Sequence, residues 1–362
     1  MKIVMFYHSF YSDWNHGNAH FIRGIVKELA KRGHEVETYE AEDNWSLTNM
    51  VKDHGRGKME EFKWYYRSLD PQFYPSGRNF IKDAILRDAD LVIVHEWNPP
   101  ELVAKIGQEK EKYGFKLLFH DTHHRSVTDE EAMQRYNLDN YDGALVFGEA
   151  IKKIYEDRQW VKNVWTWHEA ADAELFKPNR DETKEGDLVW IGNWGDGERT
   201  LELMEFLVQP IKDLGIKAKV YGVRYPEEAQ KILREANIEY GGWLPNYRVP
   251  EVFAKYKVTV HVPRRPYVEK LPGIPTIRPF EALSCGIPLI CSPWNDAEHL
   301  FTQGKDYLMA KDGNSMGYMI AEVLKSPQLS QSLSQNGRKT ILAKHTCAHR
   351  VDELEEIINK IN

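Results

Sequence analysis

The sequence predicts an α/β protein made of two Rossmann-like, doubly wound domains that face each other across a cleft. Short runs rich in β-branched and aromatic residues alternate with longer amphipathic stretches, a pattern typical of parallel strands joined by crossover helices. This alternation begins again in the second half of the chain. The length of 362 residues also exceeds the roughly 250–300 residues at which a single hydrophobic core stops growing.

The first domain is expected to span residues 1–170. Its strands are predicted at residues 2–7, 35–39, 91–95, 116–120 and 144–147. The clearest helix covers residues 19–32 and ends at Gly33, since glycine readily adopts the conformation that stops a helix. The apolar side chains of this helix share one face and are Phe21, Ile22, Ile25, Val26 and Leu29.

The second domain is expected to span residues 171–345, because a charged, turn-rich stretch at 179–187 follows a linker there. Its strands are predicted at residues 188–191, 217–221, 258–262 and 287–291. A last helix is expected within residues 346–362, with its apolar side chains at Val351, Leu354, Ile357, Ile358 and Ile361. This helix is predicted to pack back on the first domain.

Composition limits the partners and the compartment. The net charge of −7 is spread over both halves without a Lys/Arg-rich block, which disfavours a nucleic-acid partner. The three cysteines, Cys285, Cys291 and Cys347, have no CxxC spacing and suit a reducing compartment. No apolar run reaches the ~18 residues of a membrane-spanning helix. We therefore expect a cytoplasmic protein with at most peripheral membrane contact.

Two features of the second domain follow predicted strands, where doubly wound sheets bind ligands. One is a glycine-rich loop that begins at Gly192 and Asn193 and ends at Arg199, and it reads GxxGxG instead of the dinucleotide pattern GxGxxG. The other is the pair Arg264 and Arg265, since paired guanidinium groups suit a diphosphate. The turns where the base of a nucleotide would lie contain Gly222, Arg224, Leu244 and Pro245.

The start of a helix predicted at 277–285 is a third candidate for phosphate binding. A helix N-terminus offers N–H donors and a favourable dipole, and Arg278 lies in the first turn. Gly273 bends the chain before the helix, and Thr276 is expected to cap it. Glu281, one turn further on, can accept hydrogen bonds from both ribose hydroxyls.

Polar strand ends in the first domain provide catalytic candidates. His16, Gly17 and Asn18 follow the first strand and open a helix, where glycine permits close approach of the backbone to phosphate. His120 and Asp121 follow the strand ending at Phe119, and such a pair can orient a hydroxyl group or take its proton.

A carbohydrate-binding site, the candidate for an acceptor if the protein transfers a sugar, is expected at aromatic side chains of the first domain, because aromatic faces stack on sugar rings. Aromatic residues crowd the region 45–77, which includes Trp64 and Tyr66. Trp14 and Glu96, next to predicted strand ends, complete this candidate acceptor site.

No metal site is expected. Asp88 and Asp90 spell a DxD motif, but they directly precede a strand, where a turn is normal. His345, Cys347 and His349 alternate like a metal clip yet lack a fourth ligand. The cluster from His120 to Arg125 has no second His/Asp group at helical spacing.

Residues 278–290, which read RPFEALSCGIPLI, resemble the C-terminal signature of family 4 (group 1) glycosyltransferases with the GT-B fold. The linker 172–178 resembles the interdomain segment of that family, and Gly192 with Arg199 resembles its donor loop. Residues 271–294 and 345–350 look closer still to the spore-maturation-protein (CgeB-like) branch. The resemblance implies a nucleoside-diphosphate sugar donor, no metal or other cofactor, and a position for His120 beside the donor sugar.

One position departs from the family pattern. The usual first glutamate, eight positions before Glu281, falls on Gly273, and the nearest candidate to replace it is Glu269.

These observations predict a glycosyltransferase with an unidentified acceptor. If the anomeric configuration is retained, the leaving phosphate can take the acceptor's proton while His120 orients the donor sugar. If it is inverted, Asp121 or His16 is the general base. The alternatives are a nucleotide-sugar epimerase of the same fold, a catalytically silent sugar-nucleotide-binding protein, and a DNA-modifying glycosyltransferase.

Overall fold

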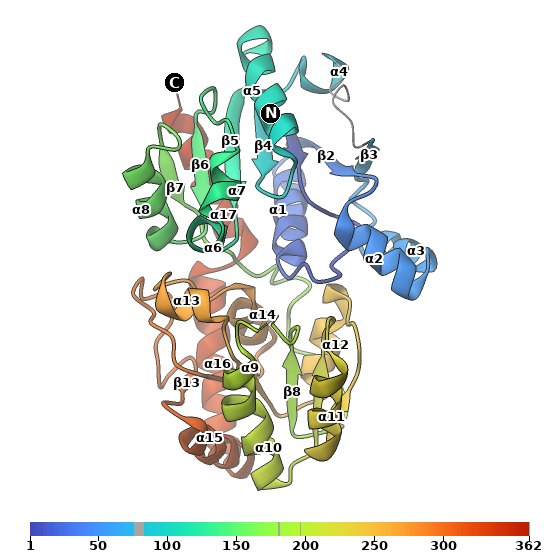
Figure 1. Cartoon of the computed structure of the whole chain (residues 1–362), viewed down its shortest axis with the longest axis vertical. Helices are drawn as coiled ribbons and strands as arrows, with labels where there is room; N and C mark the ends of the chain where they lie inside the picture. Colours follow the sequence, from blue (N-terminus) through green and yellow to red (C-terminus); the bar gives the residue numbers. More distant parts are fainter. Residues whose placement is uncertain (76–82, 180–181, 196, 362) are drawn as a thin grey trace. The chain divides into compact units, whose positions relative to one another are not determined.

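The computed structural model describes residues 1–75, 83–179, 182–195 and 197–361. The chain divides into two compact units (Figure 1): unit 1 comprises Met1–Glu169 and Cys347–Asn362, and unit 2 comprises Ala170–Thr346. Both boundaries lie within one residue of those expected from the sequence.

Unit 1 is built on a parallel sheet whose strands, over the described residues, lie in the order β3-β2-β1-β4-β5-β6-β7. The strands are β1 (Lys2–Phe6), β2 (Glu35–Ala41), β3 (Gln72–Tyr74), β4 (Leu91–His95), β5 (Lys116–Asp121), β6 (Gly143–Val146) and β7 (Val164–Thr166). The order reverses between β1 and β4, and doubly wound sheets bind ligands beyond the carboxyl ends of the strands at such a reversal.

The helices of unit 1 connect these strands and cover the sheet. They are α1 (Ala19–Lys31), α2 (Trp45–His54), α3 (Gly57–Tyr65), α4 (Asp83–Leu86), α5 (Pro100–Tyr113), α6 (Arg125–Thr128), α7 (Glu130–Gln134), α8 (Glu149–Arg158) and α17 (Cys347–Lys360). The apolar face predicted for α1 is buried, and the chain turns after it at Gly33, where φ is 84°.

The last helix, α17, packs against α1 inside unit 1. It buries Val351, Leu354, Ile357 and Ile358. The hydrogen bonds that secure it include those from Lys116 Nζ to the Ile358 carbonyl at 2.7 Å and from Trp167 Nε1 to the Arg350 carbonyl at 2.8 Å. The end of the chain therefore completes the N-terminal unit.

Unit 2 repeats the architecture, with described strands in the order β10-β9-β8-β11-β12-β13, all parallel. The strands are β8 (Leu188–Ile191), β9 (Ala218–Tyr221), β10 (Ile238–Tyr240), β11 (Val258–His261), β12 (Leu289–Cys291) and β13 (Leu308–Met309). The helices are α9 (Thr200–Leu203), α10 (Gln209–Leu214), α11 (Glu227–Glu235), α12 (Val249–Ala254), α13 (Arg265–Glu269), α14 (Ile277–Cys285), α15 (Gly313–Lys325) and α16 (Pro327–Lys344). A π-helical segment, Met204–Val208, joins α9 to α10, and a 3₁₀ turn, Asn246–Arg248, precedes α12. The switch point lies between β8 and β11.

Four short strands were not expected from the sequence: β3, β7, β10 and β13. Each has only two or three residues, which is too short for a periodic pattern to be visible. The long central strands were all predicted within a few residues of their observed bounds.

The DxD motif forms the turn that the sequence predicted. The Asp90 carboxylate accepts a hydrogen bond from the Lys2 backbone N–H at 2.7 Å. The Asp90 backbone bonds Lys2 and Lys116 at 2.9 Å each. The motif therefore connects the amino ends of β1, β4 and β5, whereas ligands are expected at the carboxyl ends of these strands.

Candidate functional site

Three arginines, Arg199, Arg264 and Arg278, gather beyond the carboxyl ends of β8 and β11 and form the arginine cluster of unit 2. Arg199 donates from Nη1 to the Val262 carbonyl at 2.9 Å and from Nη2 to both the carbonyl oxygen and Oδ1 of Asn193 at 2.8 Å. Arg264 Nη2 donates to the same Asn193 Oδ1 at 3.1 Å. One amide side chain thus holds two guanidinium groups together.

The Arg199 side chain explains why glycines stand at positions 192 and 195 of the glycine-rich loop. A Cβ at Gly192 would lie 2.9 Å from the Trp190 ring and 3.2 Å from Arg199 Nη2. A Cβ at Gly195, where φ is 97°, would lie 2.5 Å from Arg199 Cγ. The guanidinium itself lies 5.2 Å from the centre of the Trp190 ring. The glycines therefore let the loop close over Arg199 and hold its side chain at the strand ends.

The arginine cluster is electrostatically crowded. Burial, followed by the charge of Arg264, lowers the pKa of Arg199 to about 9, so this guanidinium is still protonated near pH 7. Burial, with Arg199 and Arg278 nearby, lowers the pKa of His261 to about 3 and leaves that imidazole neutral. An anion placed here would relieve repulsion between like charges.

The two neighbouring arginines after β11 behave differently. Arg264 forms an ion pair with Glu198 and stays in the cluster. Arg265 donates from Nε and Nη2 to the two carboxylate oxygens of Glu202 in α9, at 2.9 and 3.2 Å, and its side chain is 38% exposed. The structure therefore brings Arg264, but not Arg265, to the predicted phosphate site.

The turn before α14 is strained. Thr276 has φ of 58° and ψ of −178°, which a β-branched residue rarely adopts, and such strain is concentrated at functional sites. Thr276 occupies the predicted N-cap position, but its side chain makes no capping hydrogen bond; Oγ1 lies 3.4 Å from His261 Nε2 instead. In the following helix Arg278 forms an ion pair with Glu281, whose side chain is fully buried.

Gly273 is required by its surroundings. Its φ is 92°, its N–H donates to the Asn295 carbonyl at 2.7 Å, and a Cβ there would lie 2.6 Å from Glu298 Oε1. Glu269, the predicted replacement for the family glutamate, is exposed at the end of α13. The carboxylate beside position 273 thus belongs to Glu298, whose place in the loop after β12 no local spacing could have revealed.

The turns predicted to hold the base lie together. Gly222 donates its N–H to the Gly242 carbonyl at 2.8 Å, which joins the end of β9 to the segment leading into residues 244–245. Arg224 is exposed and has φ of 60°.

Unit 1 carries four buried histidines at its own switch point, His8, His16, His95 and His120, here called the histidine cluster. Their ring centroids form a chain, with 5.3 Å between His8 and His16, 6.3 Å between His16 and His95, and 5.6 Å between His95 and His120. Burial lowers the pKa of His8 and His120 to about 3 and that of His16 and His95 well below the usual value. All four imidazoles are therefore neutral near pH 7.

Each cluster imidazole keeps hydrogen-bonding capacity. His120 Nδ1 lies 2.8 Å from the Tyr7 hydroxyl, and His95 Nε2 lies 3.0 Å from Thr122 Oγ1. Within the part of the chain that the structure describes, the other nitrogen of these two rings has no hydrogen-bond partner, and neither has Nε2 of the remaining two histidines. Buried polar atoms are rarely left unsatisfied, so these nitrogens are candidates for contact with a ligand.

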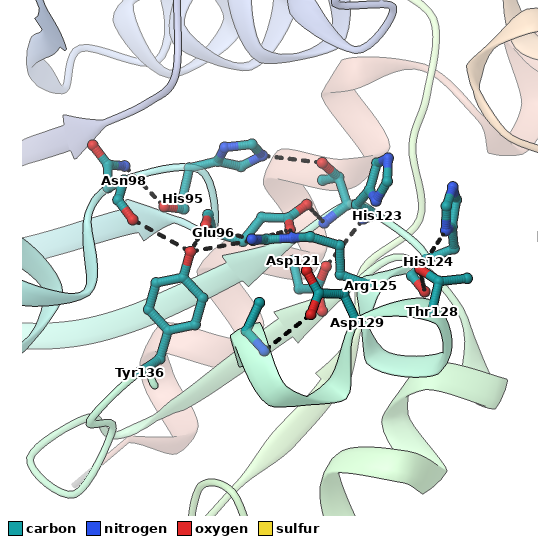
Figure 2. Close-up of polar contacts among 12 residues, drawn as sticks. His95, Glu96, Asn98, Asp121, His123, His124, Arg125, Thr128, Asp129 and Tyr136 are labelled. Atoms are coloured by element: carbon teal, nitrogen blue, oxygen red, sulfur yellow. Dashed lines mark hydrogen bonds and ion pairs between the residues drawn. The ribbon is translucent and has the colours of Figure 1, made fainter. Parts of the chain in front are cut away.

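The acidic residues at the same strand ends form a separate network (Figure 2). Arg125 Nε and Nη2 donate to Glu96 Oε2 at 3.0 and 2.6 Å, and Arg125 Nη2 also reaches the Tyr136 hydroxyl at 3.2 Å. Asp121 accepts from the Tyr155 hydroxyl at 2.8 Å. Burial raises the pKa of both Glu96 and Asp121, and the Arg125 guanidinium opposes that rise. The carboxylate of Glu96, which the sequence predicted to contact an acceptor, is thus paired with Arg125.

His120 and Asp121, which the sequence suggested as a pair, have different hydrogen-bond partners. Successive side chains of a strand point to opposite faces. His120 contacts Tyr7 and lies 4.9 Å from the Trp167 ring centre, whereas Asp121 belongs to the network around Arg125.

The loop after β1, which contains His16, Gly17 and Asn18, is held by two residues that the sequence did not single out. Glu40 on β2 is fully buried and accepts the N–H of Phe10, and burial raises its pKa to about 7. Arg23 on α1 donates to Asp13 Oδ2 at 3.0 Å. Asn18 Nδ2 donates to a carbonyl just after β5 at 3.3 Å. Glu40 directly follows the predicted strand 35–39, and a carboxyl group at the end of a strand was the signal that the sequence offered for it.

The predicted acceptor residues lie in different places. Trp14 meets Trp45, with 6.0 Å between ring centroids. Trp64 is 61% exposed on α3, where its ring contacts Tyr65. Tyr66 is buried, and its ring packs on its neighbours near Arg23. Residues 76–77 of the predicted aromatic region lie outside the described residues.

Among the described residues, no three His, Cys, Asp or Glu side chains are arranged to hold a metal ion. The same residues contain no helix with the length and apolar character needed to cross a membrane.

Comparisons with known proteins agree with the predicted class. A family described as "Glycosyl transferase-like" matches residues 199–356. No curated protein sequence matches the chain.

Solved structures share the fold at low sequence identity. Sucrose-phosphate synthase from Thermosynechococcus elongatus aligns at 15% identity over 100% of both chains with a TM-score of 0.65. HepE from Anabaena, in complex with UDP and glucose, aligns at 11% identity over 99% of both chains with a TM-score of 0.68. BGT of phage T4, in complex with UDP-glucose, aligns at 12% identity over 100% of both chains with a TM-score of 0.62.

The predicted fold and the predicted enzyme class, a glycosyltransferase, are therefore confirmed. This chain has the GT-B fold, and its residues 199–356 match a glycosyl transferase-like family.

Proposed function

We propose that this protein transfers a sugar from a uridine-diphosphate sugar to an acceptor hydroxyl without the help of a metal ion. The observation that carries the proposal is the arginine cluster at the switch point of unit 2. Arg199 is half-buried and cationic, and its hydrogen bonds to Val262 and Asn193 go to neutral oxygen atoms. Preorganised positive charge of this kind stabilises a leaving diphosphate and can replace a metal ion in that role.

The remaining parts of the donor are assigned to neighbouring groups. The strained turn at Thr276 and the start of α14 would lie against the phosphates, and Glu281 against the ribose. The joined turns at Gly222 and Gly242 would lie against the base. Uridine is supported by HepE and BGT, whose structures contain UDP or UDP-glucose.

The transfer breaks the bond from the anomeric carbon to the diphosphate oxygen and forms a bond from that carbon to the acceptor oxygen. The acceptor loses a proton, either to the leaving phosphate or to a base. His120 and His16 are the candidates for this role because each is neutral near pH 7 and has a ring nitrogen without a hydrogen-bond partner among the described residues. Asp121 would contribute to catalysis only indirectly, by holding the neighbouring Tyr155 and His123 in place.

We also propose that the chain belongs to family 4 and to its spore-maturation branch, which its motifs resemble. Its cysteine usage supports a cytoplasmic location. A nucleotide-sugar epimerase and a silent binding protein are less favoured, because residues 199–356 match a glycosyl transferase-like family.

Two measurements test the proposal. UDP and UDP-sugars should raise the melting temperature with the logarithm of their concentration, and GDP-sugars should do so less. Slow hydrolysis or transfer of the stabilising UDP-sugar should continue in excess chelator. Loss of activity in chelator with recovery in manganese would contradict metal independence, and stabilisation by no nucleotide would contradict the assigned donor.

A further inference from the structure

Three partly exposed tryptophans, Trp14, Trp45 and Trp97, meet beyond the carboxyl ends of β1 and β4 and are called the tryptophan cluster. They come from the loop after β1, the first turn of α2 and the loop after β4. The cluster therefore lies at the switch point of unit 1, where this type of sheet binds ligands. The donor assignment to unit 2 does not use it.

The local structure fixes the three rings. Asn44 caps α2 by accepting the Leu47 N–H at 2.9 Å, which sets Trp45 as the first residue of the helix. Ser46 Oγ donates to the Trp14 carbonyl at 2.8 Å. Trp14 Nε1 donates to Asp53 Oδ2 at 3.0 Å. On the other side the Arg125 guanidinium lies 4.3 Å from the centre of the Trp97 ring. These contacts hold the rings in place before any ligand binds.

The rings touch edge to face. Ring centroids are 6.0 Å apart with an interplanar angle of 78° for Trp14 and Trp45, and 6.5 Å apart with an angle of 73° for Trp45 and Trp97. Edge-to-face pairs at such distances are in contact, so no space remains between them for a methylated ammonium group, which aromatic cages enclose. The cluster therefore offers the faces of its rings, and not a gap between them, to a ligand.

Neutral polar groups lie next to this surface. The His8 ring is 4.8 Å from Trp45 and 6.1 Å from Trp97, centre to centre, and His16 lies behind it. His8 and His16 are 5% and 7% exposed, and Nε2 of each has no hydrogen-bond partner among the described residues. Aromatic faces beside a few unsatisfied polar atoms are the usual composition of a small-molecule site.

Among the described residues, the cationic group beside the cluster is compensated, because Arg125 binds the Glu96 carboxylate through two of its nitrogens. Asp53, which accepts from Trp14 Nε1, is an exposed carboxylate at the rim of the cluster. The described part of the site therefore offers stacking faces and neutral hydrogen-bonding groups, and it disfavours an acidic ligand. A pyranose ring has the matching chemistry, with C–H faces for the indoles and hydroxyls for the imidazoles.

We propose that the tryptophan cluster binds an uncharged sugar ring of the acceptor, so that this protein glycosylates a carbohydrate. The inference rests on the proposed function, because it names the acceptor of that reaction. The sugar ring belongs to either a free oligosaccharide or a glycan attached to a larger molecule, and the two sources present the same ring to the indoles.

The test uses the full chain on an array of neutral, acidic and choline-bearing saccharides, followed by calorimetry with the best soluble ligand. The parent should bind a neutral saccharide, and Trp45→Ala and Trp97→Ala should each weaken it about tenfold or more. Trp45→Phe, which keeps a ring, should retain most of the affinity and guards against misfolding of the alanine variant. Trp64→Ala removes a tryptophan outside the cluster and should stay within about twofold of the parent. UDP affinity, measured in parallel, should be unchanged in all four variants.

The outcomes separate the two proposals. A parent that binds UDP but no neutral saccharide, or that prefers choline or acidic ligands, overturns the inference, as does equal saccharide binding by Trp45→Ala and Trp64→Ala. A parent that binds a saccharide through Trp45 and Trp97 but does not bind UDP supports the sugar site and overturns the donor assignment instead. An array signal confined to protein-linked or lipid-linked glycans identifies the source of the ring and supports the inference.

Discussion

The carbonyl group of Gly192 lies directly against Gly222, in the place where a side chain at residue 222 would begin. Gly222 has φ of 154°, and its N–H bonds Gly242. This contact joins the end of β9 to the start of the loop that closes over Arg199. The arginine cluster therefore depends on the close approach of two residues without side chains.

Gly222→Ala should destabilise the protein by about 2–4 kcal/mol, because the new Cβ meets backbone that cannot rotate away. Gly242→Ala is the matched control: φ there is 70°, but a Cβ would have no atom within 4 Å. The control should lose about 1–2 kcal/mol, the cost of a left-handed conformation for alanine. Urea unfolding measures both values. Equal losses would mean that backbone conformation, and not the contact with Gly192, makes glycine necessary at 222.

Arg199→Ala should weaken UDP binding about 10–100-fold, since hydrogen bonds to charged groups contribute about 1.5–3 kcal/mol each. Arg264→Ala should weaken it as well. Arg265→Ala should change it less than about threefold, because a partly exposed ion pair with Glu202 contributes little. Calorimetry with UDP provides the three values. If Arg265→Ala lost as much affinity as Arg199→Ala, the cluster defined here would have the wrong members.

The histidine cluster should make unit 1 sensitive to acid. The native pKa values are lowered below the unfolded value of about 6.5, so the native state binds fewer protons than the unfolded chain as the pH falls. His8 and His120 therefore each contribute stability that is complete above about pH 6.5 and is lost progressively toward pH 3, by roughly 2 kcal/mol at pH 5. His16 and His95 contribute with the same sign. Buried Glu40, with its pKa raised to about 7, has the opposite sign over the upper part of this range.

A double variant isolates the histidine contribution from that of the buried carboxyls. In His95→Gln with His120→Asn, amide groups can take the places of His95 Nε2 and His120 Nδ1 without titrating. The free energy of unfolding of parent and variant should converge as the pH falls from 7.5 to 5, because only the parent loses the contribution of these two rings. A difference that stays constant with pH would show that the two rings are protonated as easily in the folded state as in the unfolded one.

Sequence reasoning predicted the central strands because these depend on local pattern, and the boundaries it expected lie within one residue of the ends of the two compact units. It singled out the loop before Arg199 from the spacing of its glycines. It missed Glu298 and Arg23, whose contacts at Gly273 and Asp13 depend on tertiary packing. It also read His120 and Asp121 as a pair from their adjacency, although the alternation of a strand separates neighbouring side chains. Arg264 and Arg265 differ for the same type of reason: only the fold shows that Glu202 lies within reach of the second arginine.

The different surroundings of His120 and Asp121 lead to the last prediction. His120 is neutral, bonds the Tyr7 hydroxyl and has a second nitrogen without a partner among the described residues, so it can meet a substrate. Asp121 accepts from the Tyr155 hydroxyl and the His123 N–H, so its oxygens hold the fold together.

His120→Ala should reduce kcat by ~10²–10⁴ if the ring transfers or positions a proton, with UDP affinity unchanged. Asp121→Asn should lower stability by about 1–3 kcal/mol and kcat by less than about tenfold. Circular dichroism, urea unfolding and initial rates on the same preparations distinguish the two effects. A stable Asp121→Asn variant with the larger loss of kcat would make Asp121 the base and reverse the assignment.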